Sequence, residues 1–143
     1  MDGGPEDLIR RIEALRADRT SGASAIVREA IAILAAARAA HADIDAAARL
    51  IRSAQPSMAS LWNATAAALS DDSDRLTQFA ERLRRAPAAI ARFATTHFAG
   101  EGTGQIQVAT LSYSSSVLTA LNAIRQTRPL AVSCSESRPA LEG

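Results

Sequence analysis

Short hydroxyl side chains gather where an apolar run of the sequence gives way to a helical pattern. Ser114 and Ser115 begin that helical pattern, soon after the β-rich run at residues 106–111. Backbone N–H groups at a helix N-terminus, next to serine hydroxyls, suit a phosphate or a carboxylate. Serines at such a position also cap helices and form turns, and the residue types alone favour that structural role.

A second polar group, Glu136 and Arg138, follows the apolar run at residues 130–134. An arginine can hold a phosphate with two parallel N–H donors, and a nearby glutamate can accept hydrogen bonds from sugar hydroxyls. A surface salt bridge is the alternative role for this pair. Open parallel sheets bind ligands at the carboxyl ends of their strands, so both polar groups stand where a ligand site is expected.

The sequence offers little support for other kinds of reaction centre. All sixteen basic residues are arginine, which excludes Schiff-base and lysine general-base chemistry. His41 and His97 are far apart in the sequence and form no ligand motif, so we expect no metal ion, and we expect no cofactor either. Cys134 is expected to be a packed thiol in a buried strand. The glycine-rich segment 100–104 precedes its strand, which excludes a dinucleotide fingerprint and indicates a flexible connector.

Hydrophobic periodicity predicts helices over the first two thirds of the chain. The helical patterns cover residues 5–17, 23–40, 43–51, 58–69 and 76–83. Asp43 and Ser57 are expected to cap two of these helices, and Pro87 either kinks the last one or begins another. Of the 143 residues, 33 are alanine, which favours helix but buries little area. The core must therefore come from the few larger apolar residues, Trp62 included.

The pattern changes after residue 100. A strand at 106–111, a helix at 114–126 and a strand at 130–134 form one βαβ unit, which implies parallel pairing and a right-handed crossover. We therefore interpret the sequence as mainly α with a C-terminal α/β piece. A helical domain at residues 1–99 precedes the start of a Rossmann-like domain at residues 100–143, and the chain is expected to stop before that domain is complete.

Two stretches of the C-terminal part can be read together. Residues 112–118 are Ser-Tyr-Ser-Ser-Ser-Val-Leu, and residues 132–143 are Val-Ser-Cys-Ser-Glu-Ser-Arg-Pro-Ala-Leu-Glu-Gly. They resemble the central region of the translation initiation factor 2B family, which comprises the alpha, beta and delta regulatory subunits, ribose-1,5-bisphosphate isomerase and methylthioribose-1-phosphate isomerase. Residues 18–30 resemble the family's first helix entry, and residues 54–58 resemble a turn of its beta and delta-like members.

The resemblance implies a helical domain joined to a Rossmann-like domain, with a sugar-phosphate site between them. The residues expected to contact the ligand are Arg19, Ser21, Gly22, Ser114, Ser115, Glu136 and Arg138. Ser112 stands at the position of the isomerases' cysteine, and Ser21 stands where they place an arginine before the Gly-Ala pair. The region of their aspartate lies beyond residue 143.

These departures favour a non-catalytic module that binds a sugar phosphate or a nucleotide-like phosphate, as a regulatory subunit would. The alternative is an aldose–ketose isomerase of the ribose-1,5-bisphosphate type, incomplete in this chain. A helical interaction module without a ligand is a third interpretation.

The composition restricts the classes of partner that this protein is expected to bind. A net charge of +1 provides no basic field for nucleic acid, and no apolar run approaches the ~20 residues of a membrane span. A single cysteine and the absence of a signal-peptide pattern predict a cytoplasmic protein. We expect a phosphorylated small molecule as the ligand and assembly into a homo- or hetero-oligomer.

Overall fold

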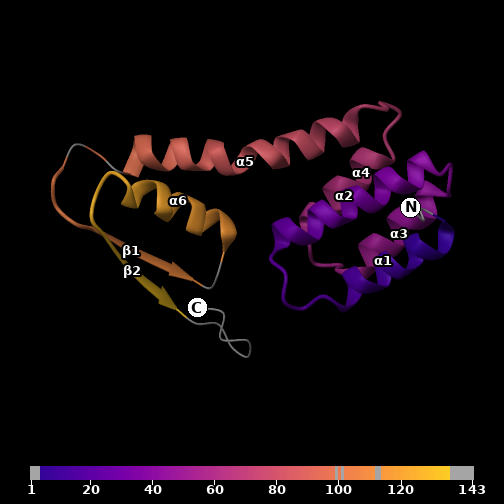
Figure 1. The fold of residues 1–143 in the computed structure, drawn as a ribbon, viewed down its shortest axis with the longest axis horizontal. Coiled ribbons are helices and arrows are strands. Elements are labelled where there is room, and N and C mark those ends of the chain that lie inside the picture. Colours follow the sequence, from indigo (N-terminus) through magenta and orange to yellow (C-terminus); the bar gives the residue numbers. More distant parts are fainter. Residues whose placement is uncertain (1–3, 99, 101, 112–113, 136–143) are drawn as a thin grey trace. The chain divides into compact units, whose positions relative to one another are not determined.

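Helices make up most of the chain, and two strands flank the last helix (Figure 1). The computed structural model describes residues 4–98, 100, 102–111 and 114–135. In chain order the elements are α1 (Pro5–Ala17), α2 (Ala23–Ala39), α3 (Ile44–Ala54), α4 (Ala59–Ala68), α5 (Arg75–Phe98), β1 (Ile106–Leu111), α6 (Ser115–Arg125) and β2 (Leu130–Ser135). This order confirms the predicted fold class, a helical bundle followed by a partial βαβ unit.

The chain divides into two compact units, residues 1–83 and residues 84–143. The division falls inside α5, whose first turns belong to the helical unit. The predicted domain boundary between residues 99 and 100 instead marks the change from helices to strands, and it stays a prediction.

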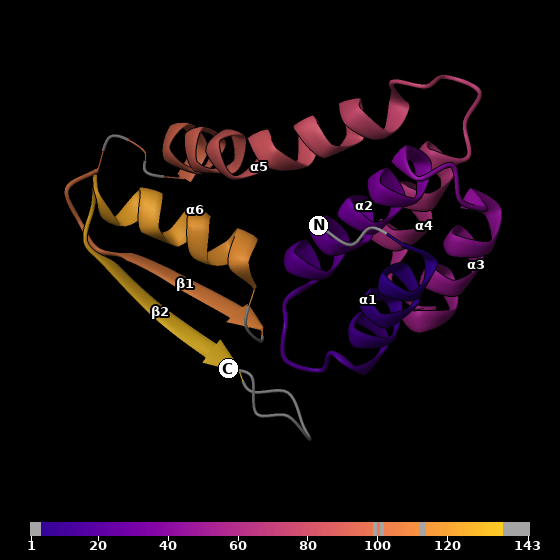
Figure 2. The same cartoon turned by 45° about the vertical axis from the view of Figure 1, so that its right-hand side comes forward.

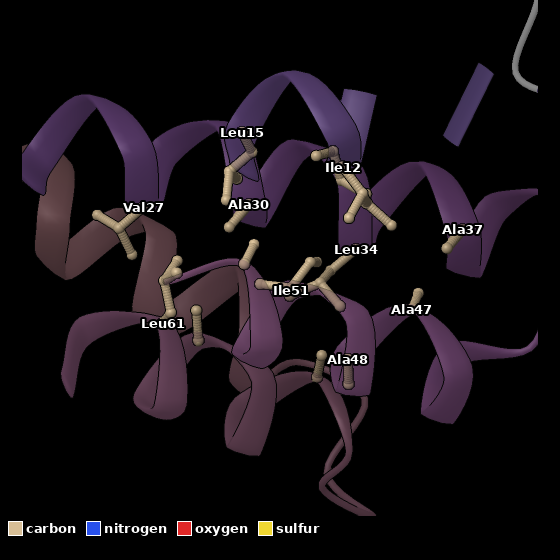
Figure 3. Packing of buried hydrophobic residues seen from close by; sticks show 14 of the residues in the cluster. Ile12, Leu15, Val27, Ala30, Leu34, Ala37, Ala47, Ala48, Ile51 and Leu61 are labelled. Atoms are coloured by element: carbon tan, nitrogen blue, oxygen red, sulfur yellow. The ribbon is translucent and has the colours of Figure 1, made fainter. Parts of the chain in front are cut away.

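Helix α2 is central to the first unit, because it packs against α1, α3 and α4. Six of its apolar residues are buried, and they form the broad stripe needed to face several neighbours: Ile26, Val27, Ala30, Ile33, Leu34 and Ala37. Figure 3 shows Val27, Ala30, Leu34 and Ala37 of this stripe in one cluster with Ile12 and Leu15 of α1, Ile51 of α3 and Leu61 of α4. Alanines at many of the contacts allow the helix backbones to approach closely, so a small set of larger side chains can fill the core.

Side-chain caps mark the start of α3 and α6, whereas α1, α2 and α4 begin without a side-chain cap hydrogen bond. Asp43 caps α3 as predicted, since its carboxylate accepts a hydrogen bond from the Ala46 N–H at 2.9 Å. The predicted cap Ser57 was wrong, because Met58 occupies the N-cap position of α4 without a side-chain hydrogen bond. There the turn is closed by the backbone, with the Met58 N–H donating to the Gln55 carbonyl at 3.1 Å.

Pro87 lies inside α5, so the additional helix that it could have begun does not form. Proline cannot donate a hydrogen bond to the carbonyl one turn earlier, which costs a helix interior ~3 kcal/mol or more. Alanines at positions 86, 88 and 89 have the highest helix propensity and favour continuation on both sides of the proline.

Strands β1 and β2 pair in parallel, in a register that runs from Ile106 opposite Leu130 to Leu111 opposite Ser135. Helix α6 connects them and lies along the sheet in both views (Figures 1 and 2). This confirms the predicted βαβ unit. Burial alternates along β1 between half-buried and exposed residues, the pattern of a strand with one covered face.

Two predictions about burial were wrong. Trp62 is 48% exposed. Its ring centroid lies 4.8 Å from Cζ of Arg52, and its indole N–H donates to the Pro56 carbonyl at 3.0 Å, so polar partners hold the ring at the surface. The second error concerns Cys134, which is exposed. It lies on β2 in a sheet that, among the described residues, has two strands, so no third strand covers it there. None of the helices in the described ranges is both long and apolar enough to cross a membrane.

The packing of the bundle core predicts that two leucines contribute very differently to the free energy of unfolding. Leu34 is 0% exposed at the centre of the cluster, whereas Leu50 on α3 is 40% exposed. Leu34→Ala should lower the free energy of unfolding by about 3 kcal/mol, through lost burial and a residual cavity. Leu50→Ala makes the same chemical change at the surface and should cost less than about 1 kcal/mol. Urea denaturation followed by far-UV circular dichroism measures both, and equal losses would contradict the packing described.

Candidate phosphate-binding site

Ser114 begins helix α6 at the carboxyl end of β1. Its hydroxyl accepts a hydrogen bond from the Val117 N–H at 3.4 Å, and its carbonyl accepts from the Leu118 N–H at 2.9 Å. The structure therefore gives Ser114 the capping role that its residue type favoured. Ser115 and Ser116, the next two residues, are exposed. As first-turn residues they have backbone N–H groups without an acceptor inside the helix, which leaves two donors for an anion.

Strand β2 ends at the same edge of the sheet, because Ser135 pairs with Leu111, the last residue of β1. The polypeptide that leaves each strand therefore starts from neighbouring points. Ser112, Glu136 and Arg138 lie outside the described residues, and their part in the site stays a prediction.

The turn between α1 and α2 contains the three remaining predicted residues and is organised by Asp18. Hydrogen bonds from the Ser21 side chain, from the Ser21 N–H at 2.8 Å and from the Thr20 N–H at 2.9 Å hold the pKa of the Asp18 carboxyl at about 2, below its ordinary value of 3.8. The Asp18 carbonyl accepts a hydrogen bond from the side chain of Gln55 at 3.2 Å. Asp18 thus ties this turn to the end of α3.

Arg19 points its guanidinium back at the end of α1. Its Nη1 donates to the Arg16 carbonyl at 2.6 Å and to the Asp18 carbonyl at 3.1 Å, which places a cation at the negative end of that helix. Gly22 is the N-cap of α2, and its carbonyl accepts from the Ala25 N–H at 2.9 Å. Arg19 and the Ser21 N–H therefore have partners within the turn, and an anion binding there has to compete with the Asp18 carboxylate.

Sequence reasoning missed Asp18 as the organiser of this turn. The signal was an aspartate two and three residues before Thr20 and Ser21, directly after α1, which is the spacing of a side chain that bonds nearby backbone N–H groups. The turn residues belong to the first unit and Ser114 and Ser115 to the second. Their combination into one site stays a prediction.

Comparison with protein families and solved structures decides the relationship. The family model of the initiation factor 2 subunit family matches residues 6–143. This chain belongs to that family. The fold agrees with the crystal structure of the Pyrococcus horikoshii OT3 translation initiation factor eIF-2B, with a TM-score of 0.72 at 22% sequence identity. The match covers 98% of this chain and 54% of that one, so the chain spans about half the length of this solved family structure. A search of curated proteins found no match.

The family resemblance drawn from residues 112–118 and 132–143 is therefore confirmed, and the likeness to the solved structure supports the fold at the level of helix and strand order.

The hydrogen bonds at Asp18 predict a pH effect. Because folding lowers the pKa of Asp18 from 3.8 to about 2, its stabilising contribution is complete above the higher value and is lost as the pH falls through the lower one. Asp18→Asn cannot ionise, so the Tm advantage of the unaltered protein over this variant should shrink across that window. Thermal melts at a series of pH values test this. An NMR titration of the Asp18 carboxyl with a midpoint near 3.8 would contradict it.

Proposed function

We propose that this chain is a non-catalytic, regulatory-subunit-like member of the initiation factor 2 subunit family that binds a phosphorylated small molecule. The observation that supports the proposal most directly is the start of α6 at the carboxyl edge of a parallel strand pair. There the Ser114 hydroxyl accepts from the Val117 N–H, while the N–H groups of Ser115 and Ser116, which have no acceptor inside the helix, could donate to a phosphate.

The distribution of charge also supports an anionic ligand. Residues 84–143 carry six arginines and three glutamates, a formal charge of +3, whereas residues 1–83 carry ten arginines and twelve acidic residues, a formal charge of −2. The small net charge of the whole chain hides this segregation. A positive second unit attracts phosphorylated molecules to the part of the chain that contains Ser115 and Arg138.

Catalysis of the isomerase type is disfavoured by residue chemistry. The reaction needs a group that moves a proton between adjacent sugar carbons, and the family resemblance places Ser112 at the position of the isomerases' cysteine. A serine hydroxyl holds its proton far more tightly than a thiol, and it acts as a nucleophile or base only when a neighbouring base activates it. Binding without turnover therefore suits these residues better than isomerisation does.

Association with other subunits is part of the same proposal. Among the described residues of the second unit, five large apolar side chains are exposed: Phe93, Phe98, Leu111, Leu118 and Val132. A sheet of two strands is marginal on its own, and buried contacts with another subunit would stabilise it. We therefore propose that the protein works in the cytoplasm as part of a homo- or hetero-oligomer.

The proposal predicts phosphate-dependent binding that requires Arg138. Ribose 1,5-bisphosphate should bind in isothermal titration calorimetry, whereas ribose without phosphate should not. Arg138→Ala should weaken binding at least tenfold, because it deletes charge-assisted hydrogen bonds worth roughly 1.5–3 kcal/mol. Arg92→Ala removes the same charge from an exposed position on α5 and should leave binding within about twofold. Equal losses in the two variants would show that only net charge matters.

A separate prediction concerns turnover. Incubation with ribose 1,5-bisphosphate or methylthioribose 1-phosphate should give no ketose detectable by NMR, because Ser112 lacks the acidity of a thiol. A ketose that forms with this chain and disappears in Ser112→Ala would overturn the non-catalytic assignment and establish the isomerase alternative.

A further inference from the structure

Arg128 lies between α6 and β2 and reaches across to the segment that precedes β1. Its Nε and Nη2 atoms donate to the Gly104 carbonyl at 3.1 Å and 2.6 Å. Two donors of one guanidinium thus converge on a single backbone oxygen, a charge-assisted contact between residues 24 positions apart in the sequence.

The glycines on this segment leave the room that the guanidinium occupies. A Cβ on Gly102 would lie 3.1 Å from Nη2 of Arg128, and a Cβ on Gly100 would lie 3.5 Å from Nη1. Gly100 also has a φ of +56°, a left-handed conformation that residues with a side chain adopt only at a cost. The sequence indicated a flexible connector here. The structure gives Gly102 a packing role against this arginine, whereas a Cβ on Gly100 would make only an ordinary contact with it.

This contact continues the register of the sheet. Ile106 pairs with Leu130 at the start of the two strands. Two positions before each of them, Gly104 accepts hydrogen bonds from Arg128. Between them the Ile106 N–H donates to the Pro129 carbonyl at 2.9 Å. The side chain of Arg128 therefore adds one more connection to the ladder, just before the paired strands begin.

We propose that Arg128 is a register latch: a positioning residue that fixes β1 against β2 from their amino ends, with Gly102 as the space that admits its guanidinium. A parallel pair of two strands needs such a device, because parallel pairing is the weaker kind and two strands alone are marginal. A slip of one residue would shift one strand end by about 3.3 Å and reverse the faces of its side chains. The effect of the latch on ligand binding rests on the proposed function, whereas its effect on the strands does not.

Hydrogen exchange without any ligand tests the latch itself. In Arg128→Ala the backbone amides of β1 and β2, that of Ile106 above all, should exchange about tenfold faster or more, as expected for loss of a charge-assisted hydrogen bond. Arg125→Ala is the matched control, because it removes an exposed arginine at the end of α6 and should exchange as the unaltered chain does. Equal protection in Arg128→Ala and Arg125→Ala would overturn the proposal.

A second variant keeps the test decisive if Arg128→Ala fails to fold. Gly102→Ala retains every charge but places a methyl group against Nη2, so it should also speed exchange in β1 and β2. If Arg128→Ala folds, the double variant tests the contact directly. There the methyl group meets no guanidinium, so adding Gly102→Ala should speed exchange by less than a further twofold. Gly4→Ala, at a position in the first unit with open space around its Cβ, is the control substitution and should leave exchange in β1 and β2 unchanged. Unchanged exchange in Gly102→Ala, or full additivity of the two changes, would refute the latch.

Titration with inorganic phosphate then separates the latch from the proposed function. If the unaltered chain binds phosphate, Arg128→Ala should weaken binding several-fold, and Arg125→Ala should weaken it less. If Arg128→Ala binds as well as Arg125→Ala, the effect of the latch on ligand binding is overturned, and the exchange measurements decide its effect on the strands. If the unaltered chain binds no phosphate, the proposed function fails, while the exchange measurements still decide whether Arg128 fixes the register.

Discussion

Parallel pairing of β1 with β2 is the constraint on which the candidate site depends. Because the strands run in the same direction, both chain segments that leave the sheet start from one edge, where Leu111 pairs with Ser135. An antiparallel pair would send them to opposite ends. The crossover helix α6 begins at that same edge, so the N–H groups of its first turn, which have no acceptor inside the helix, lie where the strands end. The chemistry proposed for this protein is therefore a consequence of strand direction before it is a consequence of any one side chain.

The helical unit solves a different physical problem, which is how to build a core from an alanine-rich sequence. Helix α2 contacts three neighbours, so each of its few large apolar side chains is shared by several interfaces. The turn that leads into α2 is held by Asp18, whose carboxylate accepts hydrogen bonds from the Thr20 and Ser21 N–H groups. The same carboxylate places a negative charge beside Arg19 and Ser21. Stability of the turn and affinity for an anion therefore oppose each other at this end of α2.

Arginine replaces lysine throughout the sequence, and the structure uses its planar fork to bind backbone carbonyls. Arg38 donates to the Ala68 and Ser73 carbonyls at 2.7 Å each, fixing the link between α4 and α5. Arg128 donates twice to the Gly104 carbonyl at the start of the sheet. A lysine ammonium lacks the planar fork that allows such paired contacts from one side chain. The links on either side of α5 are thus held by side chains that come from distant parts of the sequence.

The sequence by itself determined the order of helices and strands, the parallel βαβ unit and the membership of the family. Those features depend on periodicity, on turn residues and on short motifs, all of which are local along the chain. Only the tertiary structure decided that Trp62 lies against Arg52 at the surface, that Cys134 is exposed, and that Arg128 contacts the segment of Gly102 and Gly104. Burial and long-range hydrogen bonds depend on which distant residues arrive at the same place. The pattern of apolar and polar residues along one helix or strand does not contain that information.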